Sequence, residues 1–185
     1  MSRIISPEAI LSYPHIFEPT IPPMATDPVY SCVLVFPKES DLSEMKKIAL
    51  EVAKEKFGAK TDSLLRDGKI RMPFRTDGLE EKGYPEGSCF MNVKNKKPVD
   101  VVSIYAGPDG KPTRITDPAQ LYSGCKVRAS LRPYSYDVSG NKGVAFELGN
   151  MQKLADGERL DGRKRAEDEF EADLSAKPAD LSDLV

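Results

Sequence analysis

The stretch YSGCKVRASLRPYSY, residues 122–136, decides the fold. Side chains of a β-strand alternate between two faces. One face of this stretch is apolar and collects Cys125, Val127, Ala129 and Leu131. The opposite face collects cations, tyrosines and a serine: Tyr122, Lys126, Arg128, Ser130, Arg132, Tyr134 and Tyr136. Cations neutralise phosphates and flat rings stack on unpaired bases. The pattern is typical of a strand that contacts single-stranded nucleic acid, and equally of a half-buried strand whose polar side faces water.

Proline cannot donate a hydrogen bond to a sheet, so we predict that this strand bends or bulges at Pro133. The directions of Tyr134 and Tyr136 therefore stay open, whereas Lys126 and Arg128 are firmer members of the polar face.

Residues 88–94 repeat the same alternation. Cys89, Met91 and Val93 point one way. Phe90, Asn92 and Lys94 point the other way, and Lys96 and Lys97 follow in the turn before Pro98. Two strands with an apolar back and an aromatic and cationic front favour one shared binding face.

The remaining regular elements are predicted from hydrophobic periodicity. The apolar run 29–36 is a central strand, 99–106 is another strand, and 144–148 pairs with the long strand as a hairpin. Apolar residues recur at three- and four-residue steps between Ser40 and Gly58, which predicts an amphipathic helix.

Two segments are predicted to be less regular. Residues 1–28 contain several prolines, so any strand there is short or lies at an edge. Residues 59–87 read as a long irregular connection, which in a compact domain is usually functional or mobile. Arg75 and Tyr84 in this connection are candidates to contact a ligand.

Charge divides the chain into two parts. The whole chain carries −2, of which residues 166–185 carry −6 and residues 1–165 carry +4. We expect one nucleic-acid-binding domain over 1–165 and a disordered acidic tail over 166–185, because the tail has too little apolar area to fold. The tail is expected to occupy the basic groove or to bind partner proteins, or only to aid solubility. Its candidate partner-binding residues are Glu167, Asp168, Glu169, Phe170, Glu171, Asp173, Leu184 and Val185.

Several classes of protein are disfavoured. No apolar run approaches the roughly 18–20 residues that span a membrane, and residues 1–10 do not resemble a secretory signal, so we expect a cytoplasmic protein. The three cysteines are far apart in apolar patterns, which favours buried free thiols. The single histidine, His15, has no Cys or Asp at metal-ligand spacing. Nucleotide-loop and hydrolase motifs are absent from the sequence. We therefore expect a protein that is not an enzyme and has no cofactor or metal, although a nuclease built from carboxylates alone remains an alternative.

The order of elements predicts a mainly β protein, an OB-fold-like Greek-key barrel of five or six strands with one amphipathic helix. An antiparallel sandwich fits the strand count equally well.

The chain also resembles the single-stranded DNA-binding proteins of tailed phages, an OB-fold group. The resemblance is carried by segments that occur in order: 12–19 (SYPHIFEP), 29–37, 73–78 (PFRTDG), 122–128 with 133–136, 140–145 (GNKGVA) and 162–170. It implies a protein that coats single strands without sequence preference in phage replication and recombination, in the cytoplasm of the bacterial host. It also implies an acidic tail that contacts replication proteins or shields the DNA groove. This tail ends in Leu184 and Val185, whereas better-known members have longer tails that end in an aromatic residue.

These inferences combine into one hypothesis for the DNA site. Six cations are predicted to neutralise phosphates of the DNA: Lys94, Lys96, Lys97, Lys126, Arg128 and Arg132. Base stacking is assigned to four rings: Phe90, Tyr122, Tyr134 and Tyr136. Asn92 lies on the same face, and Arg75 and Tyr84 close the groove. The alternative is a phage OB module for protein interaction or particle structure, and both a monomer and a homodimer remain open.

Overall fold

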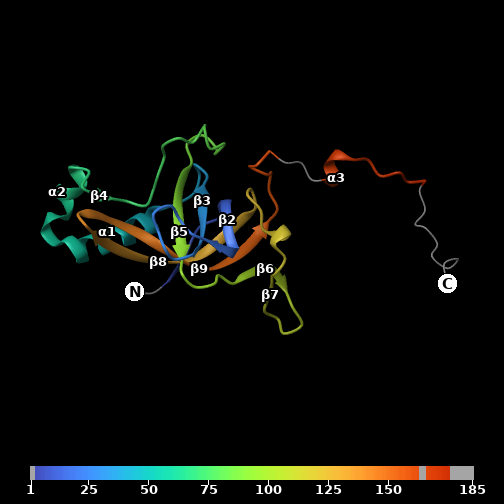
Figure 1. The fold of residues 1–185 in the computed structure, drawn as a ribbon, viewed down its shortest axis with the longest axis horizontal. Helices are drawn as coiled ribbons and strands as arrows, with labels where there is room; N and C mark the ends of the chain where they lie inside the picture. Colours follow the sequence, from blue (N-terminus) through green and yellow to red (C-terminus); the bar gives the residue numbers. More distant parts are fainter. Residues whose placement is uncertain (1–2, 163–165, 176–185) are drawn as a thin grey trace.

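Two long strands, β8 (Lys126–Val138) and β9 (Asn141–Ala155), form a hairpin that runs through the fold of the computed structural model (Figure 1). The structure describes residues 3–162 and 166–175. Within these residues the sheet has nine strands. The other seven are β1 (Ile4–Ile5), β2 (Ala9–Thr20), β3 (Val29–Phe36), β4 (Ile70–Arg71), β5 (Cys89–Asn95), β6 (Val101–Ala106) and β7 (Pro112–Arg114).

Five of these strands pair in a closed ring. The pairs β8–β2, β2–β3, β3–β5 and β8–β9 are antiparallel, and the pair β5–β9 is parallel. This is the five-stranded Greek-key order of an OB fold, in which β3 and β5 occupy the second and third positions. The predicted OB-like fold is therefore confirmed, and the sandwich alternative is wrong because one sheet closes on itself. The four strands outside the ring raise the number above the five or six that we predicted.

Strand β9 is the element to which most others attach. One of its edges pairs with β8 along its length. Its other edge pairs in succession with β4 at residues 142–143, with β5 at Glu147 and with β6 at residues 151–152. The same edge of β9 therefore carries first β5 and then β6, with residues 148–150 of β9 between the two pairings.

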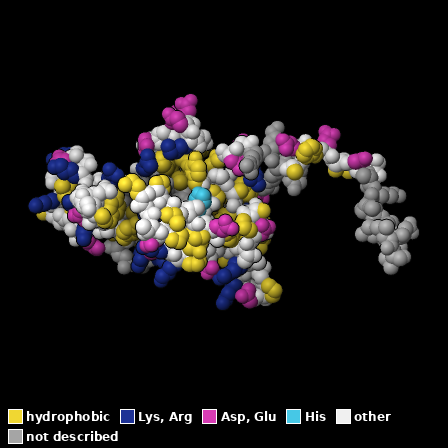
Figure 2. Space-filling view, viewed as in Figure 1, with side chains coloured by type: hydrophobic (Ala, Val, Ile, Leu, Met, Phe, Trp, Pro, Cys, Tyr) yellow, Lys and Arg dark blue, Asp and Glu magenta, His cyan; other side chains and the backbone are white. Residues whose placement is uncertain are grey.

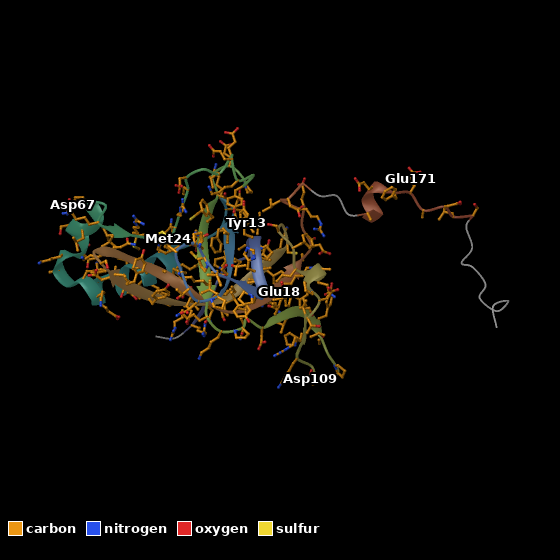
Figure 3. All side chains as sticks on the ribbon, viewed as in Figure 1. Tyr13, Glu18, Met24, Asp67, Asp109 and Glu171 are labelled. Atoms are coloured by element: carbon orange, nitrogen blue, oxygen red, sulfur yellow. The ribbon has the colours of Figure 1, made fainter. Side chains whose placement is uncertain are left out.

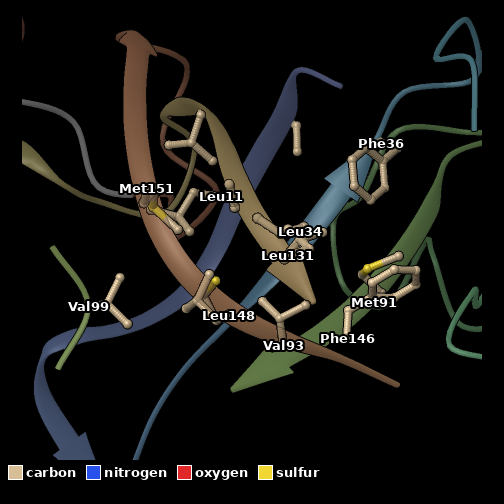
Figure 4. Close-up of a cluster of buried hydrophobic side chains, with 14 of the residues drawn as sticks. Leu11, Leu34, Phe36, Met91, Val93, Val99, Leu131, Phe146, Leu148 and Met151 are labelled. Carbon is tan, nitrogen blue, oxygen red and sulfur yellow. The ribbon is translucent and has the colours of Figure 1, made fainter. Parts of the chain in front are cut away.

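The core lies inside the ring (Figure 4). Its largest fully buried side chains include Phe36, Met91, Leu131, Phe146 and Leu148, each at most 1% exposed. The predicted apolar face of the opening stretch is confirmed, since Cys125, Val127, Ala129 and Leu131 are all buried.

Helix α1 (Ser43–Phe57) packs Met45, Ala49, Val52 and Ala53 against the sheet, next to β8 and β9. It begins later than predicted. Asp41, not Ser40, supports its first turn, because Asp41 Oδ1 accepts a hydrogen bond from the Ser43 N–H at 3.0 Å. Gly58 ends the helix as predicted, with φ of 61°, a conformation that favours glycine.

The segment 59–87 is more regular than predicted. It contains the 3₁₀ turn η1 (Gly58–Lys60), helix α2 (Thr61–Arg66) and strand β4 before its irregular part. A second 3₁₀ turn, η2 (Pro118–Gln120), precedes β8. The sequence pattern missed α2 because only six residues form it.

Strand β2 contradicts the expectation that prolines confine the N-terminal strand to an edge. It spans twelve residues and lies between β8 and β3. The prolines are tolerated because Pro14 and Pro19 fall in the two places where the register with β3 shifts, between Ser12 and His15 and between His15 and Thr20.

We predicted that the strand bends or bulges at Pro133, but the irregularity lies elsewhere in β8. Pairing of β8 with β9 continues in register from Leu131 to Val138. Beyond Leu131 the β8 strand pairs only with β9, so the missing N–H of Pro133 need not face a second partner strand. The nearest register shift lies upstream, where Ala129 and Leu131 of β8 oppose Met151 and Leu148 of β9.

The three cysteines are free, and Cys32 and Cys125 are buried while Cys89 is half-buried. Burial raises the pKa of the Cys125 thiol, which keeps it protonated at neutral pH. In the acidic tail, residues 166–169 form the short helix α3 (Ala166–Glu169), where we predicted disorder. Residues 176–185, with Leu184 and Val185, lie outside the described residues. None of the helices in 3–162 and 166–175 is long and apolar enough to cross a membrane.

Candidate nucleic-acid interface

The cations of β8 lie on its outer surface, as the alternation predicted. Lys126, Arg128 and Arg132 are exposed, while Val127, Ala129 and Leu131 between them point into the core. Each cation has a polar neighbour. Arg132 Nη2 lies 2.8 Å from Glu147 Oε2, Lys126 Nζ lies 3.8 Å from Glu8 Oε1, and Arg128 Nε donates to Gln152 Oε1 at 2.8 Å. Exposed pairs of this kind are worth about 0–1 kcal/mol, so a phosphate can replace the protein partner.

A row of polar residues crosses all five ring strands. Arg132 of β8 is paired with Glu147 of β9, and Glu147 with Lys94 of β5. The row continues through Ser31 of β3 to His15 of β2. Side chains at paired positions lie on the same face of a sheet. The row therefore joins the two strands that the sequence proposed as one binding face.

The end of β5 adds further cations. Asn92 and Lys94 are exposed on its outer side, and Lys97 is exposed in the turn that follows. Lys96 Nζ lies 2.7 Å from Asp27 Oδ2 of the β2–β3 loop, and this contact lowers the pKa of Asp27.

Phe90 was predicted to offer an exposed stacking surface and Tyr84 to close the groove, but both residues are buried. They are 2% and 6% exposed and form a small second core with Val35. Their rings meet edge to face at 5.4 Å, and the Tyr84 hydroxyl donates to Ser12 Oγ at 3.0 Å. The rings are buried because residues 72–88 fold back over β3 and β5.

Arg75 forms the lid of this second core. Its guanidinium lies 5.0 Å from the centre of the Phe90 ring and makes two hydrogen bonds to Asp77, at 2.7 and 3.1 Å. The ammonium of Lys82 lies 5.6 Å from the same ring. Arg75 is still exposed, so of the two loop candidates only Arg75 lies where a ligand can reach it.

Tyr122 was also predicted on the exposed face, and this is wrong. Strand β8 begins at Lys126, and Tyr122 lies in the preceding turn with 7% of its surface exposed. Its ring lies beneath the guanidinium of Arg159 at 4.4 Å and the ammonium of Lys153 at 5.4 Å. Its hydroxyl donates to Asp156 Oδ1 at 2.9 Å. Tyr122 thus anchors residues 156–159 to the domain.

Tyr134 and Tyr136 continue the face of Arg132 along the hairpin, and both are half-buried. Burial raises the pKa of Tyr134, and the proximity of Tyr136 and Glu147 raises it further. Tyr136 packs across Gly143, where an added Cβ would lie only 2.3 Å from the Tyr136 hydroxyl. The two rings therefore offer partly exposed surfaces rather than fully free ones.

Sequence reasoning missed Tyr13 and Lys82 and gave His15 no binding role. Tyr13 is 61% exposed and has φ of 45°, which is rare for a tyrosine and often occurs at functional sites. Together with Lys82 and Ser123, these residues line a groove of about 360 Å³. The register shift in β2 turns Tyr13 outward, so no strand periodicity could have revealed it.

Figures 2 and 3 show this surface from one side. His15, the chain's single histidine, lies near the middle of the viewed face, with Lys and Arg side chains at several places along its rim. Tyr13 lies on the same face, close to β2, β3 and β5 (Figure 3). OB folds bind oligonucleotides on the second and third strands and the adjoining loops. Here these strands are β3 and β5, which places Asn92 and Lys94 on that surface.

The tail candidates are described only in part. Phe170 is 74% exposed, and Glu169, Glu171 and Asp173 are exposed. The side chains of Glu167 and Asp168 are outside the described set. Among the described residues, no group of three or more His, Cys, Asp or Glu side chains is placed to hold a metal ion.

Comparison with known proteins gives consistent matches. Residues 2–182 match the profile of the family described as Enterobacter phage Enc34, ssDNA-binding protein. Over 176 residues the chain is 31% identical to putative protein p50 of Acyrthosiphon pisum secondary endosymbiont phage 1. The matched region covers 89% of this chain and 90% of that relative.

Solved structures of phage proteins share the fold. The single-stranded DNA-binding protein of bacteriophage Enc34 in complex with ssDNA superposes with a TM-score of 0.65 at 22% identity, over 85% of this chain and 89% of that one. The gp2.5 single-stranded DNA-binding protein of bacteriophage T7 superposes with a TM-score of 0.58 at 17% identity, over 96% and 98% of the two chains.

Proposed function

Because this chain belongs to the family of the single-stranded DNA-binding protein of Enterobacter phage Enc34, we propose that it binds single-stranded DNA in phage DNA replication and recombination. Binding is independent of sequence and involves no catalysis. The protein acts in the cytoplasm of the bacterial host, where phage DNA is copied.

The observation that carries the proposal is the polar row from Arg132 through Glu147 and Lys94 to His15. It passes over β5 and β3, the surface that OB folds use for oligonucleotides. The two cations of the row, Arg132 and Lys94, can contact phosphates of a flexible backbone without specifying any base.

The roles of the residues follow from their exposure. Phosphates contact the exposed cations Lys94, Lys96, Lys97, Lys126, Arg128 and Arg132, with Arg75 and Lys82 at the rim. Asn92 donates or accepts a hydrogen bond on the same surface. Bases stack on Tyr13, His15, Tyr134 and Tyr136. Phe90, Tyr84 and Tyr122 support the surface from beneath.

The acidic tail competes with DNA for this surface and contacts replication proteins. Support comes from its charge of −6 next to a domain of +4. Two polyanions cannot occupy one cationic groove together, so the tail and a DNA strand exclude each other.

The test is a titration of fluorescently labelled oligo-dT, since the chain has no tryptophan. Lys94→Ala should weaken binding several-fold and reduce the magnitude of the salt slope by about 0.7. Lys47→Ala is the matched control, because Lys47 is exposed on α1.

Equal affinities for the Lys94→Ala and Lys47→Ala proteins would contradict the assignment of Lys94. A wild-type protein without affinity for oligo-dT would instead support the alternative of an OB module for protein interaction. Degradation of the oligonucleotide that depends on Mg²⁺ would indicate a nuclease.

A further inference from the structure

A second groove lies over the C-terminal half of β9, away from the β3–β5 surface. Its volume is about 500 Å³. Its walls are Ile5 of β1, Val102 of β6 and Pro112 of β7, and its floor carries Arg128, Ser130, Asn150 and Gln152. We refer to these seven residues as the β9 trough.

A register shift shapes the floor of the trough. Leu148 and Met151 of β9 both point into the core, although they are three residues apart, and they oppose Leu131 and Ala129 of β8. The extra residue of β9 forms a β-bulge at Gly149 and Asn150, a device that redirects side chains. The Asn150 N–H donates to Ser130 Oγ at 2.8 Å, which fixes the bulge.

The Asn150 side chain is exposed in the trough, and its amide makes no hydrogen bond to another described residue. Amide side chains recognise the edges of bases because they present a donor and an acceptor together. The position is therefore suited to a base that lies in the trough.

Arg128 lines the trough, and Arg114, whose Nη2 lies 3.0 Å from Asp100 Oδ2, follows it in the same register row. Along one register row, Arg128 of β8 pairs with Gln152 of β9, Gln152 with Val102 of β6, and Val102 with Arg114 of β7. Gln152 also accepts from Arg128 Nε at 2.8 Å and donates to the Ser103 carbonyl at 3.0 Å. Among the described residues that line the trough none is acidic. The guanidinium of Arg128 beside an apolar wall suits a phosphate followed by a base.

The trough is continuous with the proposed DNA surface. Glu147, which lies beside Lys94, and Gln152, which lies beside Val102, are on the same strand. Arg132 and Arg128 are four residues apart on β8, roughly 13 Å at the rise of a strand. A DNA strand that leaves β5 can therefore follow β9 towards β6.

We propose that the β9 trough is a second contact site for single-stranded DNA, which binds the part of a longer strand that extends beyond the β3–β5 surface. This inference rests on the proposed function. It predicts that the protein contacts more nucleotides than the OB surface alone accommodates, and that the trough contributes only when the strand is long enough to reach it.

The test compares a short and a long oligo-dT, of about 6 and about 16 nucleotides, which span the usual range for one OB fold. DNA is kept in molar excess so that each strand carries one protein molecule. Asn150→Asp places a negative charge in the trough and should weaken binding of the long strand about fivefold. Binding of the short strand should change less than twofold.

Gln120→Glu is the matched control, because it makes the same amide-to-carboxylate change at an exposed residue of η2 outside the trough. Lys94→Ala should weaken binding of both the short and the long oligo-dT, which distinguishes the β3–β5 surface from the trough.

The inference is overturned if Asn150→Asp leaves the affinity for the long oligo-dT unchanged while Lys94→Ala still weakens binding of both oligonucleotides. It is also overturned if Asn150→Asp changes the sedimentation coefficient of the free protein and not its affinity for the long oligo-dT. The trough would then be an interface between two copies of this chain. Absence of binding by the wild-type protein would overturn the proposed function and this inference together.

Discussion

At the scale of single residues, Glu147 lies within the polar row of the proposed DNA surface. Its Oε2 lies 2.8 Å from Arg132 Nη2 and 3.7 Å from Arg3 Nη2, and its backbone is paired with that of Lys94. The carboxylate holds the side chains of Arg132 and Arg3 in place when DNA is absent. It also repels the phosphate that would take its place.

We therefore predict that Glu147→Gln binds single-stranded DNA more tightly, by about fivefold at low salt, because one repulsive charge near the phosphates is removed. The change in the free energy of unfolding should stay below about 1 kcal/mol, because Arg132 and Arg3, the ion-pair partners of Glu147, are exposed. Anisotropy titrations at several salt concentrations check the affinity, and urea unfolding checks the stability.

Glu51→Gln on the exposed face of α1 is the control, with the same change of charge on a different element. Weaker binding by Glu147→Gln would show that Glu147 positions Arg132 for DNA rather than competing with it.

At the scale of elements, the segment 72–88 works with β5 and β3 as a support for the binding surface. Its Tyr84 packs with Phe90 of β5 and Val35 of β3. The backbone N–H of Arg75 donates to the Phe90 carbonyl at 2.9 Å, and the Phe90 N–H donates to the Arg75 carbonyl at 2.8 Å. The aromatic residues of this region stabilise the fold, and the exposed cations and amides around them are left to contact the ligand.

Phe90→Ala should accordingly lower the free energy of unfolding by about 3–5 kcal/mol, the cost of emptying a buried phenylalanine site. Phe170→Ala is a control with the same substitution at a position that is 74% exposed, and it should cost less than about 0.5 kcal/mol. Urea unfolding followed by circular dichroism measures both.

The milder Phe90→Leu keeps the fold intact and should keep its affinity for oligo-dT. Loss of affinity in Phe90→Leu without loss of stability would show that Phe90 stacks on a base after all.

At the scale of the whole molecule, charge is distributed so that the domain and the tail oppose each other. The domain over 1–165 carries +4 and the tail over 166–185 carries −6. Opposite charges on one chain attract strongly at low ionic strength and weakly beyond a Debye length of about 8 Å at physiological salt. We therefore expect the tail to compete with DNA most strongly at low salt.

Deletion of residues 166–185 should raise the affinity for single-stranded DNA, and the gain should shrink as salt increases. Oligo-dT titrations from low to physiological salt measure this gain. A full-length variant with the seven tail acids changed to their amides should show the same gain, because charge rather than length causes the competition. Equal affinities of the full and truncated chains at low salt would contradict the competition.

The sequence by itself determined the elements and faces that depend on neighbouring residues. Alternation in residues 125–132 placed Val127 and Leu131 inside and Arg128 and Arg132 outside, because each strand side chain points opposite to the one before it. Hydrophobic spacing located α1, and the order of strands with the family resemblance indicated the OB-like fold.

Tertiary structure alone decided which aromatic residues are exposed. Phe90 lies on the face of β5 that the alternation predicted, but residues 72–88 cover it. No local pattern predicts which distant segment will fold over a strand. Tyr122 is buried because Arg159, thirty-seven positions later, lies over its ring. Tyr13 is exposed because a register shift turns it outward. The β9 trough likewise exists only because β1, β6 and β7 meet around the bulge at Asn150. Alternation fixes the direction of a side chain relative to its own strand, whereas its exposure depends on long-range packing.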